Sequence, residues 1–79
     1  MPTIYQQGKY KFVIRTREPA WKRPHAHVLG PNVELSIALD DFEVLAVNGR
    51  ISAGLLREFI AILQRHHEEF MQAWSDCHG

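Results

Sequence analysis

Two histidines separated by one residue are the side chains of this sequence best suited to chemistry. They stand in the run Pro24–His25–Ala26–His27–Val28. Side chains alternate between the two faces of a β-strand, so both imidazoles are expected on one face, with Cα atoms about 6.8 Å apart. Histidine titrates near neutral pH and is a common metal ligand, so the pair suits acid–base catalysis or metal binding.

Metal binding would need a further ligand from elsewhere in the chain. Zinc sites use two imidazoles at this spacing when other ligands complete the coordination shell. The candidate third ligands are His66, His67, His78, Asp40 and Asp41. None of them stands at a spacing diagnostic of a zinc motif, so no cofactor is expected. A divalent metal such as zinc on His25 and His27 is an alternative hypothesis. The simpler interpretation is that both rings hydrogen-bond backbone groups or carboxylates at the edge of the sheet.

RNA cleavage is a second use of the same pair. One imidazole would act as general base and the other as general acid, with Arg15 and Lys22 near the phosphate. Cations interleaved with aromatic residues suit single-stranded nucleic acid. The formal net charge of zero, however, falls short of the basic balance of a nucleic-acid module. We keep a ribonuclease-type toxin as an alternative, and the sequence favours a protein that is not an enzyme.

Composition predicts one intracellular domain over residues 1–79. Hydrophobic residues make up 46% of the chain, which is too high for a disordered protein. Cys77 is the single cysteine, so no internal disulfide can form. No signal peptide or apolar run long enough to cross a bilayer is present, so we expect a cytoplasmic protein with no membrane association. Residues 1–25 carry a balance of +5 and residues 26–79 a balance of −5.

Strands are expected between residues 3 and 50. Alternating or β-prone runs occur at Thr3–Gln6, Tyr10–Arg15, His25–Leu29 and Val33–Leu39. Gly8 and the run Gly30–Asn32 predict the turns of two hairpins. Thr16–Pro24 is expected to be a loop, and Val44–Val47 fits either a short strand or one helical turn.

A long helix is expected from about residue 53 to 76, with Ser52 as its N-cap. Its apolar positions follow the spacing of one helical face: Leu56, Phe59, Ile60, Leu63, His67, Phe70, Met71 and Trp74. The order of elements predicts an α+β fold, in which a small antiparallel sheet of three to five strands is covered on one face by this helix. A helix this long, in a chain this short and apolar, favours a partner protein or a second copy.

Motifs along the whole chain resemble one small bacterial family. They are the opening Met1–Ile4, Gly8, the aromatic strand Tyr10–Phe12, the histidine run, Gly30, the segment Gly49–Ser52 and the closing Ala73–Trp74 and His78–Gly79. Together they resemble the family called domain of unknown function 4160. Its most specific element is Pro-x-His-x-His, in which Ala26 replaces the usual valine. The Arg15–Arg23 segment follows no family pattern.

The resemblance implies no settled activity. Genes of this family often neighbour those of a second small family, domain of unknown function 2442, and the pairs are proposed as toxin–antitoxin modules. The resemblance therefore implies an interaction protein of a type II toxin–antitoxin-like pair, bound to that neighbouring product or to a second copy. We expect an exposed sheet edge and the helix face of Phe59, Leu63, Phe70 and Trp74 to carry the contacts. Which partner is toxic stays open.

Overall fold

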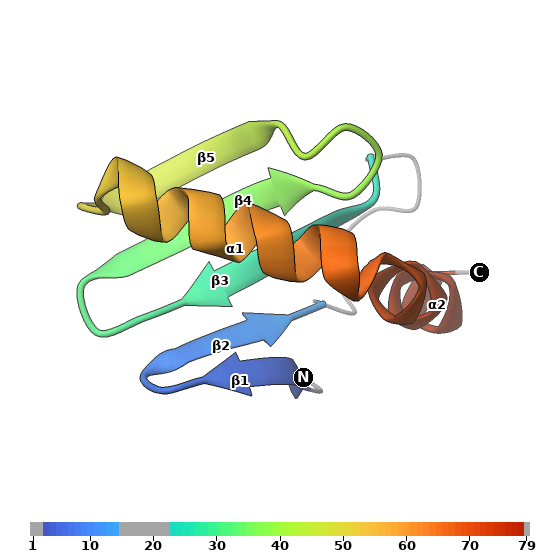
Figure 1. Cartoon of the computed structure of the whole chain (residues 1–79). Helices are drawn as coiled ribbons and strands as arrows, with labels where there is room; N and C mark the ends of the chain where they lie inside the picture. The colour runs from blue at the N-terminus through green and yellow to red at the C-terminus, as the bar shows by residue number, and fades with distance from the viewer. Residues whose placement is uncertain (1–2, 15–22, 79) are drawn as a thin grey trace.

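The computed structural model describes residues 3–14 and 23–78. The described residues form the strands β1 (Thr3–Gln7), β2 (Tyr10–Val13), β3 (His25–Leu29), β4 (Val33–Ala38) and β5 (Val44–Gly49), and the helices α1 (Ala53–Arg65) and α2 (His67–His78). This α+β fold, with helices following an antiparallel sheet, confirms the expected class (Figure 1). The expected end of the second strand at Arg15 and most of the expected loop Thr16–Pro24 lie outside the described residues.

The five strands form an antiparallel meander in the order β1-β2-β3-β4-β5. Both expected hairpins form. Gly8 turns β1 into β2 with a φ of 58°, a value that glycine adopts without steric cost. The amide of Gly30 donates to the carbonyl of Val33 at 2.9 Å and closes the turn between β3 and β4. The strand that carries the histidines therefore lies in the middle of the sheet, and β5 lies at one edge.

Residues 40–50, which fitted either a strand or a helix, form a turn and then β5. The amide of Ala38 donates to the carbonyl of Glu43 at 2.8 Å, which brings the chain back along β4. Phe42 adopts a φ of 61° in this turn. At the far end of β5, Gly49 has a φ of 100°, and a Cβ there would collide with the carbonyl oxygen of Asn32. Glycine is therefore required where β5 passes the β3–β4 turn.

The single helix expected over residues 53–76 is divided into two. Ser52 caps α1 as predicted, because its hydroxyl accepts a hydrogen bond from the amide of Leu55 at 3.1 Å. The backbone leaves helical geometry at His66, with φ −108° and ψ 27°. A straight helix of 24 residues would be about 36 Å long, and the longest dimension of the protein is 33 Å. The bend lets α2 fold around the end of the sheet (Figure 1).

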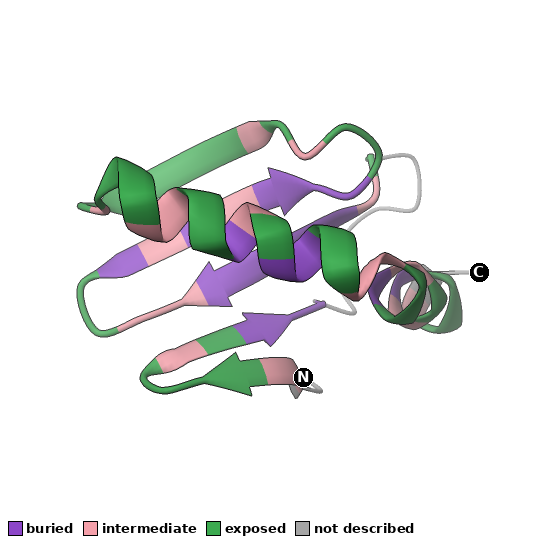
Figure 2. Cartoon of the chain, in the orientation of Figure 1, coloured by how far each residue is buried: buried purple, intermediate pink, exposed green. Residues whose placement is uncertain are grey.

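The core lies between one face of the sheet and the two helices. Phe12 is at its centre, with its ring centroid 5.4 Å from that of Phe59 and 6.0 Å from that of Phe70. Each helix thus supplies one aromatic ring to the same residue of β2. Figure 2 shows buried residues on β2, β3 and β4, whereas most of β5 is exposed. Burial of apolar area in this layer is the main source of stability.

Candidate functional site

The two candidate histidines lie inside the protein. His25 is 5% exposed and His27 is 6% exposed. Their ring centroids are 5.0 Å apart in an edge-to-face arrangement, so the predicted pairing on β3 forms. β3 also has a neighbouring strand on each side, so its backbone lies away from both edges of the sheet. Two buried imidazoles offer little surface to a polymeric substrate.

Both imidazoles are also engaged by the protein's own groups. His25 Nδ1 lies 2.7 Å from the carbonyl oxygen of Arg23, and since a carbonyl only accepts, this nitrogen carries the proton. His27 Nδ1 lies 3.2 Å from Oγ of Ser36, the residue opposite it on β4. The ring of Trp74 on α2 lies 5.0 Å from that of His25. The pair therefore connects β3 to β4 and α2. The other catalytic candidates, Arg15 and Lys22, lie outside the described residues.

The candidate third metal ligands are engaged elsewhere. His67 Nε2 donates to the carbonyl of Leu39 at 2.8 Å, and His66 Nδ1 lies 3.0 Å from a carboxylate oxygen of Glu69. Asp40 and Asp41 are bound by Arg23, and the side chain of His78 is not described. Among residues 3–14 and 23–78, no three histidine, cysteine or acidic side chains converge as a metal site would require.

An arginine with three carboxylates around it fixes the turn before β5, a feature that the sequence analysis did not predict. The guanidinium of Arg23 lies 2.8 Å from Asp40, 2.7 Å from Asp41 and 2.8 Å from Glu43. The hydrogen bond from Arg23 is the largest cause of a lowered pKa at Asp40, and partial desolvation opposes it. The hydrogen bonds that Arg23 donates, first to Asp40 and then to Glu43, raise the pKa of Arg23 above its ordinary value. Because these side chains are exposed, each pair contributes little energy, but together they define where β5 begins.

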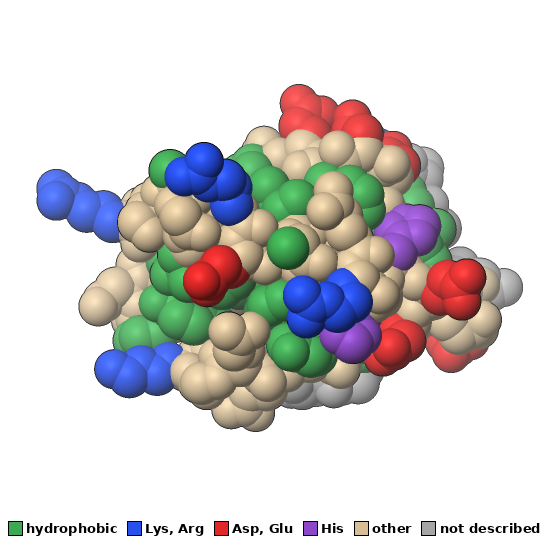
Figure 3. Space-filling model, in the orientation of Figure 1, with side chains coloured by type: hydrophobic (Ala, Val, Ile, Leu, Met, Phe, Trp, Pro, Cys, Tyr) green, Lys and Arg blue, Asp and Glu red, His purple; other side chains and the backbone are tan. Residues whose placement is uncertain are grey.

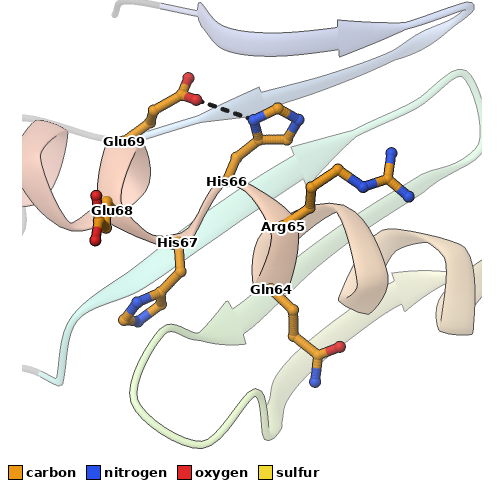
Figure 4. A pocket seen from close by; sticks show the side chains of 6 residues that line it. All are labelled: Gln64, Arg65, His66, His67, Glu68 and Glu69. Carbon is orange, nitrogen blue, oxygen red and sulfur yellow. Dashed lines mark hydrogen bonds and ion pairs between the residues drawn. The ribbon is translucent and has the colours of Figure 1, made fainter.

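A shallow depression of about 380 Å³ lies at the bend between the helices. It is lined by six consecutive residues, Gln64, Arg65, His66, His67, Glu68 and Glu69. Figure 4 shows that His66 and His67 point to opposite sides of the bend. The His66 ring lies 5.0 Å from that of Tyr5, whereas the His67 ring lies 5.7 Å from that of Phe42. Apart from His66 and Glu69, which contact each other, the lining side chains diverge. The depression therefore follows from the break in the helix, and its lining residues do not converge around a ligand.

The helix residues expected to bind a partner pack in the protein's own core. Phe59, Leu63, Phe70 and Trp74 are between 0 and 8% exposed. All four belong to the hydrophobic core that includes residues of the sheet. The amphipathic pattern was correctly recognised, but its apolar face is covered by this chain's own sheet. Any partner must contact other residues.

The sheet has two edges, β1 and β5, and β5 is the one that carries exposed apolar side chains. Leu45 is 41% exposed and Val47 is 47% exposed, and they are the exposed large hydrophobic residues of the described chain. From Val44 to Gly49 the strand contains no charged residue. Natural edge strands usually carry charges or prolines that prevent pairing with another chain. The other edge strand, β1, is also free of charged residues, so the exposed Leu45 and Val47 are what distinguish β5.

Comparison with known protein families gives a match over most of the chain. The sequence model of the family described as a domain of unknown function, DUF4160, matches residues 9–75. The chain belongs to this family. No curated protein and no solved structure matches the chain.

Membership of DUF4160 does not choose between the two candidate regions, because the matched residues include both the histidines of β3 and the whole of β5. It confirms the resemblance read from the motifs. Of the helices in the described part of this DUF4160 chain, neither has the length and hydrophobicity needed to cross a membrane.

Proposed function

We propose that this chain is a small interaction protein that binds another protein by adding a strand at the edge of β5. We further propose that the partner is the product of a neighbouring gene in a bacterial toxin–antitoxin-like pair, as the family resemblance implies. The observation that carries the first proposal is the exposed, charge-free edge with Leu45 and Val47 on it. Extended segments bind such edges through main-chain hydrogen bonds, with side-chain contacts providing specificity.

The direction of the backbone groups on β5 follows from the pairing of its neighbours. Gly30 bonds to Val33 across the β3–β4 turn, so alternate residues of β4 starting with Val33 face β3. Glu34 and Ser36 therefore face β5, where their partners are Asn48 and Ala46. Val47 lies between Ala46 and Asn48, so its amide and carbonyl point away from β4, and those of Gly49 do the same. The amides and carbonyls of Val47 and Gly49 therefore lie along the open edge of β5, where a further strand would form hydrogen bonds.

The structure gives less support to the ribonuclease alternative. General acid–base catalysis requires a side chain within hydrogen-bond reach of the substrate. His25 and His27 are 5 and 6% exposed, and their Nδ1 atoms already contact Arg23 and Ser36. A scissile phosphate would therefore have to reach side chains that are almost fully buried in the folded protein. We therefore favour binding over catalysis.

Co-purification with the neighbouring gene product tests the proposal. The affinity tag is placed on the partner, and the wild type is compared with Val47→Lys, which puts a charge on the edge. Val47→Thr keeps a β-branched side chain without charge, and Gln6→Lys puts the same charge on β1 at the other edge. We expect Val47→Lys to weaken binding at least about tenfold, equivalent to about 1.4 kcal/mol, and the two controls to bind like the wild type.

Two results would contradict the proposal. One is repeated failure of the wild type to form a complex with the neighbouring product. The other is a Val47→Lys variant that binds as tightly as the wild type, which would place the contact elsewhere. Circular dichroism of each variant establishes that the fold is kept.

A further inference from the structure

We infer that, when no partner is bound, β5 pairs with β5 of a second copy of this chain, antiparallel and around a twofold axis at Val47. This inference rests on the proposed function, because it names the occupant of the same edge in the unbound protein. Self-pairing would join two five-stranded sheets into one continuous sheet. The partner would then have to displace the second copy, so homodimer and hetero-complex would exclude each other.

The chemistry of the strand makes it complementary to itself. In an antiparallel pair, residues that face outward on one strand bond to residues that face outward on the other. Val47 and Gly49 face outward on β5, as the pairing with β4 requires. A register centred on Val47 places each Val47 opposite its counterpart and sets Gly49 opposite Leu45 of the other copy. The glycine leaves space for leucine, and the two valines bury apolar surface that is exposed in the monomer.

Charges at the two ends of β5 favour the antiparallel direction. Asp40, Asp41 and Glu43 precede the strand, and Arg23 neutralises only one of these three charges. Arg50 follows the strand. An antiparallel pair brings the acidic start of one strand beside the basic end of the other, whereas a parallel pair would bring like charges together.

The same separation of charge extends beyond the strand. Figure 3 shows acidic side chains gathered over the turn before β5 and at the α2 end of the molecule, whereas basic side chains predominate at the opposite end. A twofold rotation about an axis at the middle of β5 therefore places the acidic end of one copy beside the basic end of the other. The second copy is thus favoured by charge as well as by the apolar edge.

Size-exclusion chromatography with light scattering tests self-pairing on the full chain without a tag or partner. We expect the wild type to show twice its monomer mass of 9.1 kDa as concentration rises. Val47→Lys and Val47→Glu are each expected to be monomers, because like charges would meet on the axis. An equimolar mixture of the two should recover the dimer, since lysine then faces glutamate, and Val47→Thr should stay dimeric.

A cysteine variant tests the position of the axis independently. Directly opposite residues in a hydrogen-bonded antiparallel pair have Cα atoms about 5.5 Å apart, within the range that a disulfide spans. In a Cys77→Ser background, Val47→Cys is expected to form a disulfide-linked dimer on mild oxidation, whereas Gln6→Cys on β1 is not. A wild type that stays monomeric at every concentration would overturn the inference. So would a Val47→Lys variant that stays dimeric or charge variants that do not recover the dimer when mixed.

The two proposals fail in different ways. If the wild type alone is monomeric but binds the neighbouring product through Val47, self-pairing is wrong and the proposed function stands. If the homodimer forms and no hetero-complex does, the proposed function is wrong and self-pairing stands. If both form, added partner should convert the homodimer into the hetero-complex, and a complex that contains the intact homodimer would overturn mutual exclusion.

Discussion

Strand β3 and strand β5 differ in what their residues suggest and in what their positions allow. β3 carries two histidines that suit catalysis or metal binding, yet it lies in the middle of the sheet and both rings are at most 6% exposed. β5 carries no ionisable side chain, yet it lies at the edge with Leu45 and Val47 exposed. The residue types of β3 suggest a functional site there, whereas solvent exposure suggests that a partner would contact β5. Under the proposed function, the exposed strand is the one expected to bind a partner.

The difference also separates two kinds of interaction. On β3 the hydrogen-bonding groups of the side chains meet partners in the same chain, such as Ser36 and the carbonyl of Arg23. On β5 the backbone groups of Val47 face away from the sheet, as the alternation of the ladder requires. The interior is thus expected to respond to mutation through stability, and the edge through binding.

The largest effect on stability is expected in the core that lies under the helices. Phe70→Ala removes a ring that is 0% exposed and contacts Phe12, and such changes cost about 3–5 kcal/mol. Urea unfolding of this variant beside Leu45→Ala, which truncates an exposed edge residue, measures the contrast. A smaller loss for Phe70→Ala than for Leu45→Ala would contradict the assignment of Phe70 to the core rather than to a partner surface.

A smaller loss of stability is expected for the buried histidine. His27→Ala removes the hydrogen bond to Ser36 and leaves space in the sheet, so we expect a loss of about 1–3 kcal/mol in the free energy of unfolding. His66→Ala, at a half-buried position on the helix bend, is the matched control and should cost less. A His27→Ala variant that is as stable as the wild type but has lost a cellular effect would instead favour a catalytic histidine.

The smallest effect is expected at the turn that begins β5, and it depends on pH. Arg23 holds the pKa of Asp40 below its ordinary value of about 3.9. A lowered folded-state pKa stabilises the protein above that ordinary value, and the contribution is lost as pH falls through the folded pKa. Arg23→Gln should therefore be less stable than the wild type at neutral pH, and the gap should close in acid. Thermal unfolding over a pH series measures it, and a gap that widens in acid would contradict this account.

Local patterns predicted most of the fold. The alternation in Val33–Leu39, the turn at Gly30–Asn32 and the helical spacing from Phe59 onward all predicted elements that the structure contains. The division of the helix was not predictable, because the apolar spacing continues in phase across His66. The identity of β5 was ambiguous because four apolar residues fit a strand or a helix, and only its pairing with β4 decides.

The candidate site was predicted less well, for a physical reason. Sequence spacing correctly placed His25 and His27 on one face of a strand, with rings 5.0 Å apart. Their burial depends on neighbours brought by long-range pairing, including Ser36 and Trp74. Likewise, an amphipathic helix face does not tell whether the chain's own sheet or a partner covers it.

Amide hydrogen exchange measured by NMR, with and without the bound partner, tests the central claim most directly. We predict that the amides of residues 47 and 49 exchange fast in the monomeric Val47→Lys variant and at high dilution of the wild type. In the wild-type complex, residues 47 and 49 should become protected while the amide of His27 is unchanged. Protection that appears around His25 and His27, with residues 47 and 49 still exchanging fast, would contradict the account. It would indicate that the partner binds near the histidines of β3.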